Sequence, residues 1–225
     1  YLELAIMQAK ASQRLHIDLS IIQKIITHEY RLFDKGGDFF YDQISAFHKS
    51  IRGSSPDGAL FWCLLMLKNG CSAQYILRRL VRIASEDIGN ADPRALEIAL
   101  NAWDSYERLG AAEGELIIAQ AVLYLASAPK SNAAYLAYKQ CKKAIDANPP
   151  CDVPIHLRNA PTHLARDLNH GKDYQYPHDH PYAYVPNEQY LPLNNRDRYY
   201  LPVERGLEIK IKQKLDFLQQ LDATS

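Results

Sequence analysis

Five basic residues occur in two short stretches with spacing suited to phosphate contacts: Lys49, Arg52, Arg78, Arg79 and Arg82. Residues four apart share one face of a helix, so Arg78 and Arg82 would project together and could contact a DNA backbone. A solvated, salt-bridged helix face is the more ordinary explanation, and a contact between subunits is a third. For Lys49 and Arg52, the ordinary explanation is that cations stabilise the C-terminal end of a helix.

Histidine and aspartate side chains that could hold a metal ion gather in the last third of the chain: His163, His170, Asp173, His178, Asp179 and His180. His178 and His180 can face one ion only if a further ligand comes from elsewhere. We therefore expect no metal ion. We expect these side chains to hydrogen-bond within the surrounding segment instead.

Catalytic groups are not evident in the sequence. Glu86 and Asp87 are paired acids near a helix end, but no nucleophile accompanies them, which favours a structural role. The chain has no GxxxxGK[ST] motif, and its one Gly-Lys pair, Gly171-Lys172, is followed by Asp173. We expect no catalytic or cofactor-binding residue within these 225 residues.

The composition fits a compact soluble domain. Of the 225 residues 47% are hydrophobic, enough to bury one sizeable core, and 26 basic residues balance 26 acidic ones. Any nucleic-acid contact must therefore come from a local patch. No apolar run approaches the roughly 18 to 20 residues that cross a bilayer, and we expect a cytoplasmic chain without membrane contact. The four cysteines show no CxxC pairing, so we expect free thiols.

Capping residues and glycines predict a series of helices up to about residue 148. Ser55 and Pro56 have the residue types of an N-cap and a first helical residue, and they precede nine consecutive apolar residues at 59–67. The chain opens at Tyr1 inside a helical pattern without a cap, so we expect it to be part of a longer protein. Further helices are expected over residues 39–52, 73–88, 93–109 and 132–148.

The segment 116–126 is apolar on nearly every side, with Gln120 as the exception. Such a helix must be covered all round, either as a central helix or at a subunit interface. We expect Ile118 and Leu125 to point outward. The candidate interface residues are Leu116, Ile118, Val122 and Leu125.

After Pro150 prolines and tyrosines recur as far as residue 202. Flexible linkers lack large aromatic residues, so we expect an ordered wrap packed on the helical domain. Residues 161–168 could form one short helix. The apolar residues from 207 to 218 predict a closing helix, although the alternation over 207–211 would also suit a strand.

Long segments spread over most of the chain resemble one family: YDQISAFHKSIRGSSPDGALFW (41–62), RRLVRIASEDIGNADPRAL (78–96), YLASAPKSNAAYLAY (124–138), HLRNAPTHL (156–164) and GKDYQYPHDHP (171–181). They are similar to the C-terminal region of the MgsA/RarA replication-associated recombination ATPases. This AAA+ group includes the Werner-helicase-interacting ATPase.

The resemblance implies an all-α fold, in which a helical oligomerisation domain is similar to the clamp-loader collar and carries a Pro/Tyr-rich C-terminal wrap. Residues 1–30 would end the AAA+ lid. Residues 31–150 would form the oligomerisation domain. Residues 151–225 would form the wrap and closing helix, packed on the same domain.

For function, the resemblance implies the tetramerisation domain of an ATPase that maintains replication forks and acts in recombination and repair. ATP and magnesium would bind upstream, in the parent protein. The partners would be other copies in a homotetramer, DNA through the full-length protein, and single-strand-binding or replisome proteins. The alternative is a module that docks DNA or a protein partner, with oligomerisation incidental.

Overall fold

A computed structural model gives an all-α chain, with no strand among the residues that it describes, which are 38–147, 152–192 and 197–224. The helices expected within residues 1–30, and the predicted end of the lid there, lie outside the described residues. Contacts divide the chain into two compact units. The first unit comprises the described residues up to 85 together with 94–128, and the second comprises 86–93 and the residues after 128.

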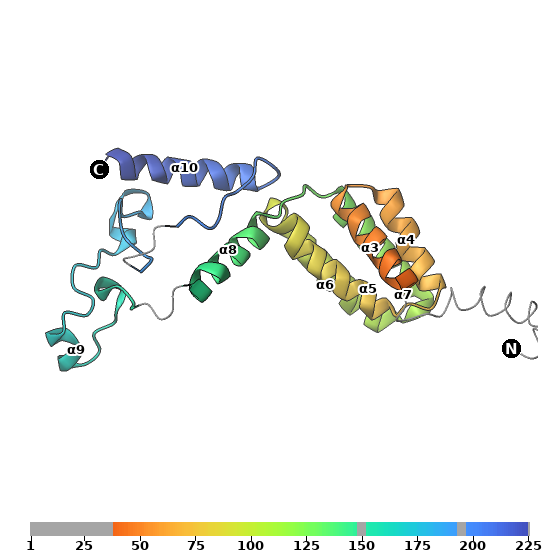
Figure 1. Ribbon diagram of the computed structural model, residues 1–225, viewed down its shortest axis with the longest axis horizontal. Coiled ribbons are helices and arrows are strands. Elements are labelled where there is room, and N and C mark those ends of the chain that lie inside the picture. The colour runs from red at the N-terminus through yellow and green to blue at the C-terminus, as the bar shows by residue number, and fades with distance from the viewer. Residues whose placement is uncertain (1–37, 148–151, 193–196, 225) are drawn as a thin grey trace, which may run out of the picture. The chain divides into compact units, whose positions relative to one another are not determined.

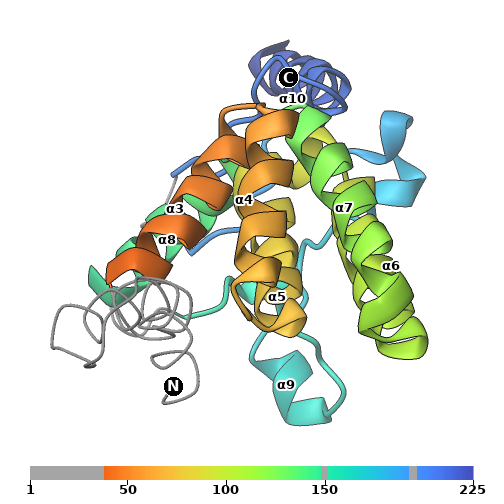
Figure 2. The ribbon, with the colours of Figure 1, turned by 90° about the vertical axis from the view of Figure 1, so that its right-hand side faces the viewer.

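The first unit is a bundle of five helices (Figures 1 and 2): α3 (Asp38–Arg52), α4 (Pro56–Lys68), α5 (Ala73–Ile83), α6 (Arg94–Leu109) and α7 (Ala111–Ser127). Short loops join α3 to α4 and α6 to α7, which makes the helices of each pair antiparallel neighbours. The helix α7 packs against all four others. Of the two positions expected for this helix, the structure shows the central one.

Local capping explains where several of these helices begin and end. The Ser55 side chain accepts a hydrogen bond from the Gly58 amide at 3.3 Å, and Pro56 opens α4, as predicted. Ser72 precedes α5, but its hydroxyl donates to the Gln74 side chain at 2.7 Å and does not cap the backbone.

Apolar side chains from all five helices fill the core of the first unit. The fully buried large residues include Phe47, Ile51, Met66, Ile76, Leu77, Leu80 and Ile83. A Cβ atom at Gly114 would lie 2.6 Å from the Tyr106 ring, so glycine permits the close approach of α6 and α7. Cys63 is also buried in this core. Its burial, with smaller contributions from the nearby Cys71 and Glu115, raises the pKa of the Cys63 thiol to about 12.

The described residues of the second unit form three α-helices and several single turns. Before α6 this unit includes the last three residues of a π-helical turn η1 (Ala84–Ile88), whose first two belong to the first unit, and a 3₁₀ turn η2 (Gly89–Ala91). The remaining elements are α8 (Ala133–Ala147), η3 (Ile155–Leu157), α9 (His163–Asp167), η4 (Pro177–Asp179), η5 (Pro181–Ala183) and α10 (Glu208–Thr224). The short helix predicted within 161–168 and the closing helix are confirmed, and the strand alternative for 207–211 is wrong because α10 begins there.

A buried carboxylate joins distant parts of the second unit. Glu208 is 0% exposed at the start of α10. It accepts hydrogen bonds from the Ser131 hydroxyl at 2.7 Å, the Tyr200 hydroxyl at 3.0 Å and the Val203 amide at 2.9 Å. A buried charge is tolerated only when such donors surround it. Glu208 therefore connects α10 with the segment that precedes α8.

The turn before α10 lies against η2. The Leu207 amide donates to the Ala91 carbonyl at 2.8 Å, and Asn90 Nδ2 donates to the Tyr200 hydroxyl at 3.1 Å. Gly206 has a φ of +55°, and a Cβ atom there would collide with the same Ala91 carbonyl oxygen. Only glycine suits this position.

None of the helices in the described ranges has both the length and the apolar character needed to cross a bilayer.

Candidate DNA-binding and subunit interfaces

The predicted cations of α3 lie in its last turn. Lys49 and Arg52 are both exposed, where positive charge stabilises the negative end of the helix dipole. Arg52 Nη2 lies 3.0 Å from His48 Nε2, and because a guanidinium can only donate, this imidazole nitrogen is the acceptor. Local structure thus accounts for much of this pair, as the sequence indicated.

The predicted cations of α5 divide into two kinds. Arg78 and Arg82 are exposed one turn apart, opposite the buried side of the helix, whereas Arg79 is half-buried. The Arg78 guanidinium lies over the Tyr75 ring, 5.4 Å from its centroid. The Tyr75 ring in turn lies 5.2 Å from the Phe40 ring, which makes α3 and α5 neighbours. Whether these cations bind DNA stays a prediction.

The predicted outward orientation of Ile118 and Leu125 on α7 is wrong. Ile118, Val122 and Leu125 are each 0% exposed and lie in the core of the first unit, where they pack against its other helices. Leu116, in contrast, is 76% exposed, and Leu123 one heptad later is 38% exposed. The outer side of α7 therefore carries Leu116 and Leu123, and of the four candidates only Leu116 is available to another subunit.

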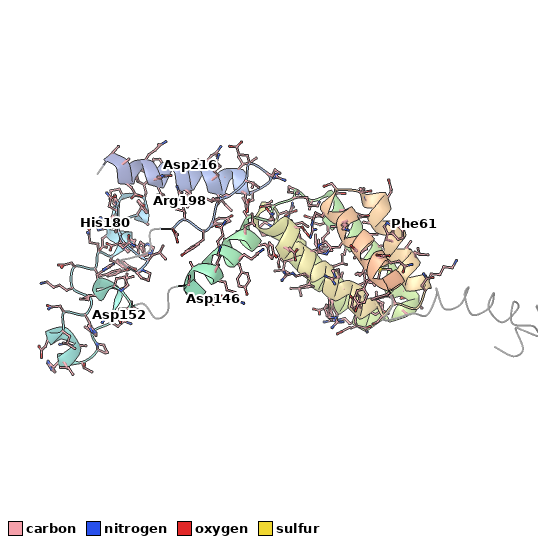
Figure 3. The ribbon with its side chains drawn as sticks, viewed as in Figure 1. Phe61, Asp146, Asp152, His180, Arg198 and Asp216 are labelled. Carbon is pink, nitrogen blue, oxygen red and sulfur yellow. The ribbon has the colours of Figure 1, made fainter. Side chains whose placement is uncertain are left out.

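Two neighbours of α7 also present exposed apolar side chains. On α4, Phe61 is 59% exposed and Leu64 42% exposed, and Figure 3 shows Phe61 at the surface of the bundle. On α6, Leu96 is 38% exposed and Leu100 46% exposed. Both helices pack against α7. Single exposed leucines are normal on a soluble protein. Here α7 and the two helices that pack against it each expose two large apolar side chains, and exposed apolar groups in such number are a candidate interaction surface.

The histidine and aspartate residues considered as metal ligands do not gather in the structure. Among the described residues, no cluster of three potential ligands includes His163, His178 or His180. The His178 ring instead packs against the Tyr176 ring, with centroids 5.1 Å apart. The hydrogen bonds expected from these side chains are made by another histidine, which the sequence did not single out.

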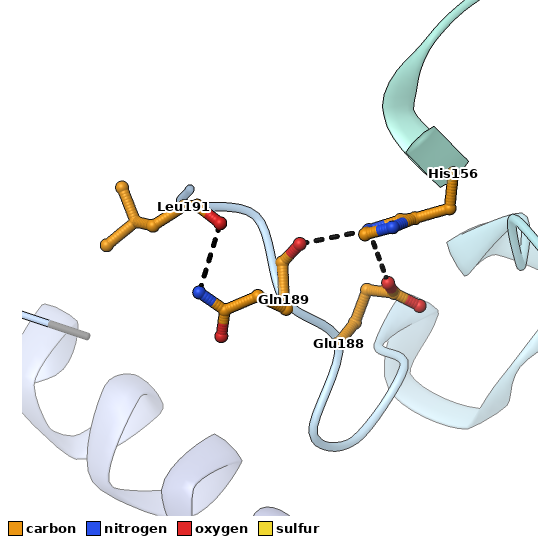
Figure 4. Close-up of polar contacts among 4 residues, drawn as sticks. All are labelled: His156, Glu188, Gln189 and Leu191. Atoms are coloured by element: carbon orange, nitrogen blue, oxygen red, sulfur yellow. Dashed lines mark hydrogen bonds and ion pairs between the residues drawn. The ribbon is translucent and has the colours of Figure 1, made fainter. Parts of the chain in front are cut away.

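That histidine is His156, shown in Figure 4. Its Nε2 atom lies 2.9 Å from the Gln189 carbonyl oxygen and 2.9 Å from Glu188 Oε1. Both oxygens are acceptors, so Nε2 carries the proton and donates to them. Gln189 Nε2 also donates to the Leu191 carbonyl at 3.1 Å. These contacts connect η3 with a loop more than 30 residues later in the chain. The residues around His156 in the sequence give no indication of them.

A second set of contacts fixes the wrap to the end of α10. The Tyr184 hydroxyl donates to Asp222 Oδ1 at 2.7 Å, and the Asn187 amide donates to the same oxygen at 2.8 Å. Burial and this hydrogen bond raise the pKa of Tyr184 to about 12. The Tyr182 and Phe217 rings meet edge to face, 5.0 Å apart. The expected ordered wrap is thus held by tyrosines.

Two family models match consecutive parts of the chain. The one described as MgsA AAA+ ATPase C terminal matches residues 53–219, and the one described as AAA C-terminal domain matches residues 1–52. The chain belongs to the MgsA family of AAA+ ATPases. The two matches meet in the loop between α3 and α4, although α3 supplies Phe47 and Ile51 to the core of the first unit. The family boundary therefore does not separate two cores.

Relatives with curated names span bacteria and a eukaryote. Replication-associated recombination protein A of Coxiella burnetii is 53% identical over 211 residues, which cover 93% of this chain and 48% of that protein. The protein of the same name from Escherichia coli K12 is 52% identical over 194 residues, covering 86% and 43%. ATPase WRNIP1 of Dictyostelium discoideum is 44% identical over 161 residues, covering 72% and 18%. The MgsA-family chain spans less than half the length of these relatives.

Proposed function

We propose that this chain is the C-terminal tetramerisation region of a AAA+ ATPase that acts in replication-fork maintenance, recombination and repair. The observation that carries the proposal is the outer side of α7. Leu116 and Leu123 are exposed on a helix whose opposite side already fills the core, and α4 and α6, which pack against α7, each expose two apolar side chains. Family membership and the names of the relatives supply the context of replication and recombination.

Such a region affects ATP turnover without touching nucleotide. ATP and magnesium would bind to the part of the parent protein that precedes this chain. Sites in AAA+ assemblies are usually completed by a residue of the neighbouring subunit. A helical region that fixes the spacing of the subunits would therefore control hydrolysis. As part of this proposal, we expect the helical region to resemble the clamp-loader collar.

The solution mass of the chain across concentration tests the proposal. Sedimentation equilibrium is expected to show a tetramer that dissociates on dilution. Leu116→Asp together with Leu123→Asp should give dimers or monomers with unchanged helical circular dichroism, because a charge in a dry contact costs several kcal/mol. The matched control is Asn101→Asp, an exposed position on the polar side of α6. A monomeric wild-type chain, or a double variant that stays tetrameric, would contradict the proposal.

The second candidate function is a DNA-docking module in which oligomerisation is incidental. It is favoured by the exposed cations Lys49, Arg78 and Arg82 on two neighbouring helices. A monomer that binds DNA would support this function over the first. Loss of that binding in Arg78→Gln with Arg82→Gln would assign it to α5.

A further inference from the structure

The helix α8 of the second unit has an outer face that its own fold leaves uncovered. Its inner side consists of small residues, with Ala133 buried and Ala134 close to Gly89 of η2. Tyr135, Ala137, Cys141 and Ala144 are half-buried, and the remaining residues are exposed. Its exposed residues are Leu136, Tyr138, Lys139, Gln140, Lys142, Lys143, Ile145, Asp146 and Ala147.

Basic and aromatic groups are combined on this face. Tyr138 is 65% exposed, and Lys139 Nζ lies over the half-buried Tyr135 ring, 5.8 Å from its centroid. Lys142 and Lys143 follow one turn later, and no salt bridge within the described ranges engages either of them. The one acid on this helix is Asp146, at its C-terminal end (Figure 3). The helix therefore carries a net positive charge.

We propose that this outer face of α8 binds single-stranded DNA, with Lys139, Lys142 and Lys143 contacting phosphates and Tyr138 stacking on a base. Lysines that follow a backbone and an exposed ring that accepts a base are the two elements of single-strand recognition. Duplex DNA offers the same phosphates but hides its base faces. The exposed tyrosine thus favours the single strand. The inference takes only the partner class, DNA, from the proposed function and uses a different surface.

Two simpler explanations account for less of what α8 exposes. Cations near a helix C-terminus stabilise its dipole, but the dipole gives no reason to expose Tyr138. A protein partner would explain the tyrosine, but lysines are depleted in protein interfaces. The combination of three lysines with an exposed tyrosine matches nucleic acid in both respects.

Fluorescence anisotropy with a labelled oligothymidylate, titrated at several salt concentrations, tests the inference on the 225-residue chain. In Lys142→Gln with Lys143→Gln, the slope of log affinity against log salt should fall by about 0.7 for each lysine–phosphate ion pair that the substitutions remove. The matched control is Lys210→Gln with Lys214→Gln, two exposed lysines of α10. An unchanged slope in the α8 variant, or an equal fall in the control, overturns the inference.

Tyr138→Ala separates stacking from charge. It should weaken oligothymidylate binding by roughly fivefold or more without changing the salt slope, and should leave duplex binding unaltered. Asp146→Asn should strengthen binding, a gain that misfolding cannot produce. Binding that is indifferent to Tyr138→Ala overturns the inference, as does α8-dependent binding to phosphatidylserine vesicles but not to oligothymidylate.

The solution mass of each variant keeps this inference separate from the proposed function. The α8 variants are expected to retain the wild-type mass, because α8 lies outside the first unit. Normal mass with unchanged DNA binding overturns the α8 site and leaves tetramerisation intact. A monomeric wild-type chain, together with the expected loss of DNA binding in the α8 variants, overturns tetramerisation and leaves the α8 site intact.

Discussion

The interior of the first unit is stabilised by a different kind of interaction from the interior of the second. The first unit buries large apolar side chains from five helices, such as Phe47, Leu80 and Ile118. The second unit has few such residues, and one of its fully buried large side chains is the carboxylate of Glu208. Its wrap is fixed by hydrogen bonds from Tyr184, Tyr200 and other polar groups.

This difference shows how the same chain can obtain order in two ways. Apolar burial is non-directional and tolerates many equivalent packings, so the helices of the first unit need only the correct periodicity. A buried polar group such as the Glu208 carboxylate is stabilised only when each hydrogen-bond donor is correctly placed beside it. The second unit should therefore depend on a few individual residues, and the first unit on its total buried area.

The largest effect is expected from a charge in the first core. Ile118→Asp places an unpaired carboxylate among apolar groups, at a cost of several kcal/mol, comparable with the roughly 5 to 15 kcal/mol that stabilise a whole domain. The first unit should unfold, and the Cys63 thiol should become reactive in pulse labelling. Leu116→Asp is the matched control on the exposed side of the same helix. It should leave Cys63 protected, and equal labelling in both variants would show that α7 has no buried side.

The next effect concerns the polar centre of the second unit. Glu208→Ala leaves three donors without their acceptor, and we expect a loss of about 3 to 5 kcal/mol. Hydrogen exchange should accelerate in α8 and α10 while α7 stays protected. Glu204→Ala is the control, because that carboxylate is exposed and pairs with Lys212 at the surface. Exchange in α7 rising in step with α10 would show that the two units unfold together.

A smaller and pH-dependent effect is expected at Tyr184. Its pKa of about 12 exceeds the ordinary tyrosine value of about 10, so its neutral form stabilises the folded state. This contribution is complete below pH 10 and disappears as the pH rises to about 12. Tyr184→Phe should cost about 1 to 2 kcal/mol at neutral pH and progressively less in that alkaline range. Urea unfolding of both proteins across pH measures the difference, and a constant difference would contradict the role of the hydroxyl.

The smallest effect is expected at His156. Replacing it with alanine removes one donor from Glu188 and Gln189 at a partly exposed site, at a cost of about 1 kcal/mol. Limited proteolysis should cleave the loop near Gln189 faster. His163→Ala, at an exposed position of α9, provides the comparison and should have no effect. Faster cleavage in both variants would mean that the loop responds to any change in the wrap.

Features encoded by neighbouring residues were predictable from the sequence. The start of α4 at Ser55 and Pro56 depends on residues within one turn, and the exposed pair Arg78 and Arg82 follows from helical spacing alone. Helix existence in the first unit was predictable for the same reason. The closing helix α10 was ambiguous only where its first residues alternate.

Features that depend on distant partners were not predictable. Within the apolar segment of α7 the one indication of the exposed side is Gln120, which lies one turn from Leu116 and from Leu123. A single polar residue is a weak signal, and Ile118 was placed on the wrong side. Glu208 resembles an ordinary surface acid at a helix start, and His156 is one of several histidines. Their roles appear only when the fold brings Ser131 or Gln189 to them.

The long sequence separations between hydrogen-bonded residues of the second unit also determine when this unit can form during synthesis. Ser131 and Glu208 are 77 residues apart, and Asn90 and Tyr200 are 110 apart. Closing such long loops costs entropy before any contact forms, and chains emerge from the ribosome N-terminal end first. The Ala91 carbonyl therefore cannot accept its hydrogen bond until Leu207 has been translated. The described helices of the first unit, in contrast, have all been translated once synthesis reaches residue 128. The outer leucines of α7 can meet another nascent chain before the second unit exists.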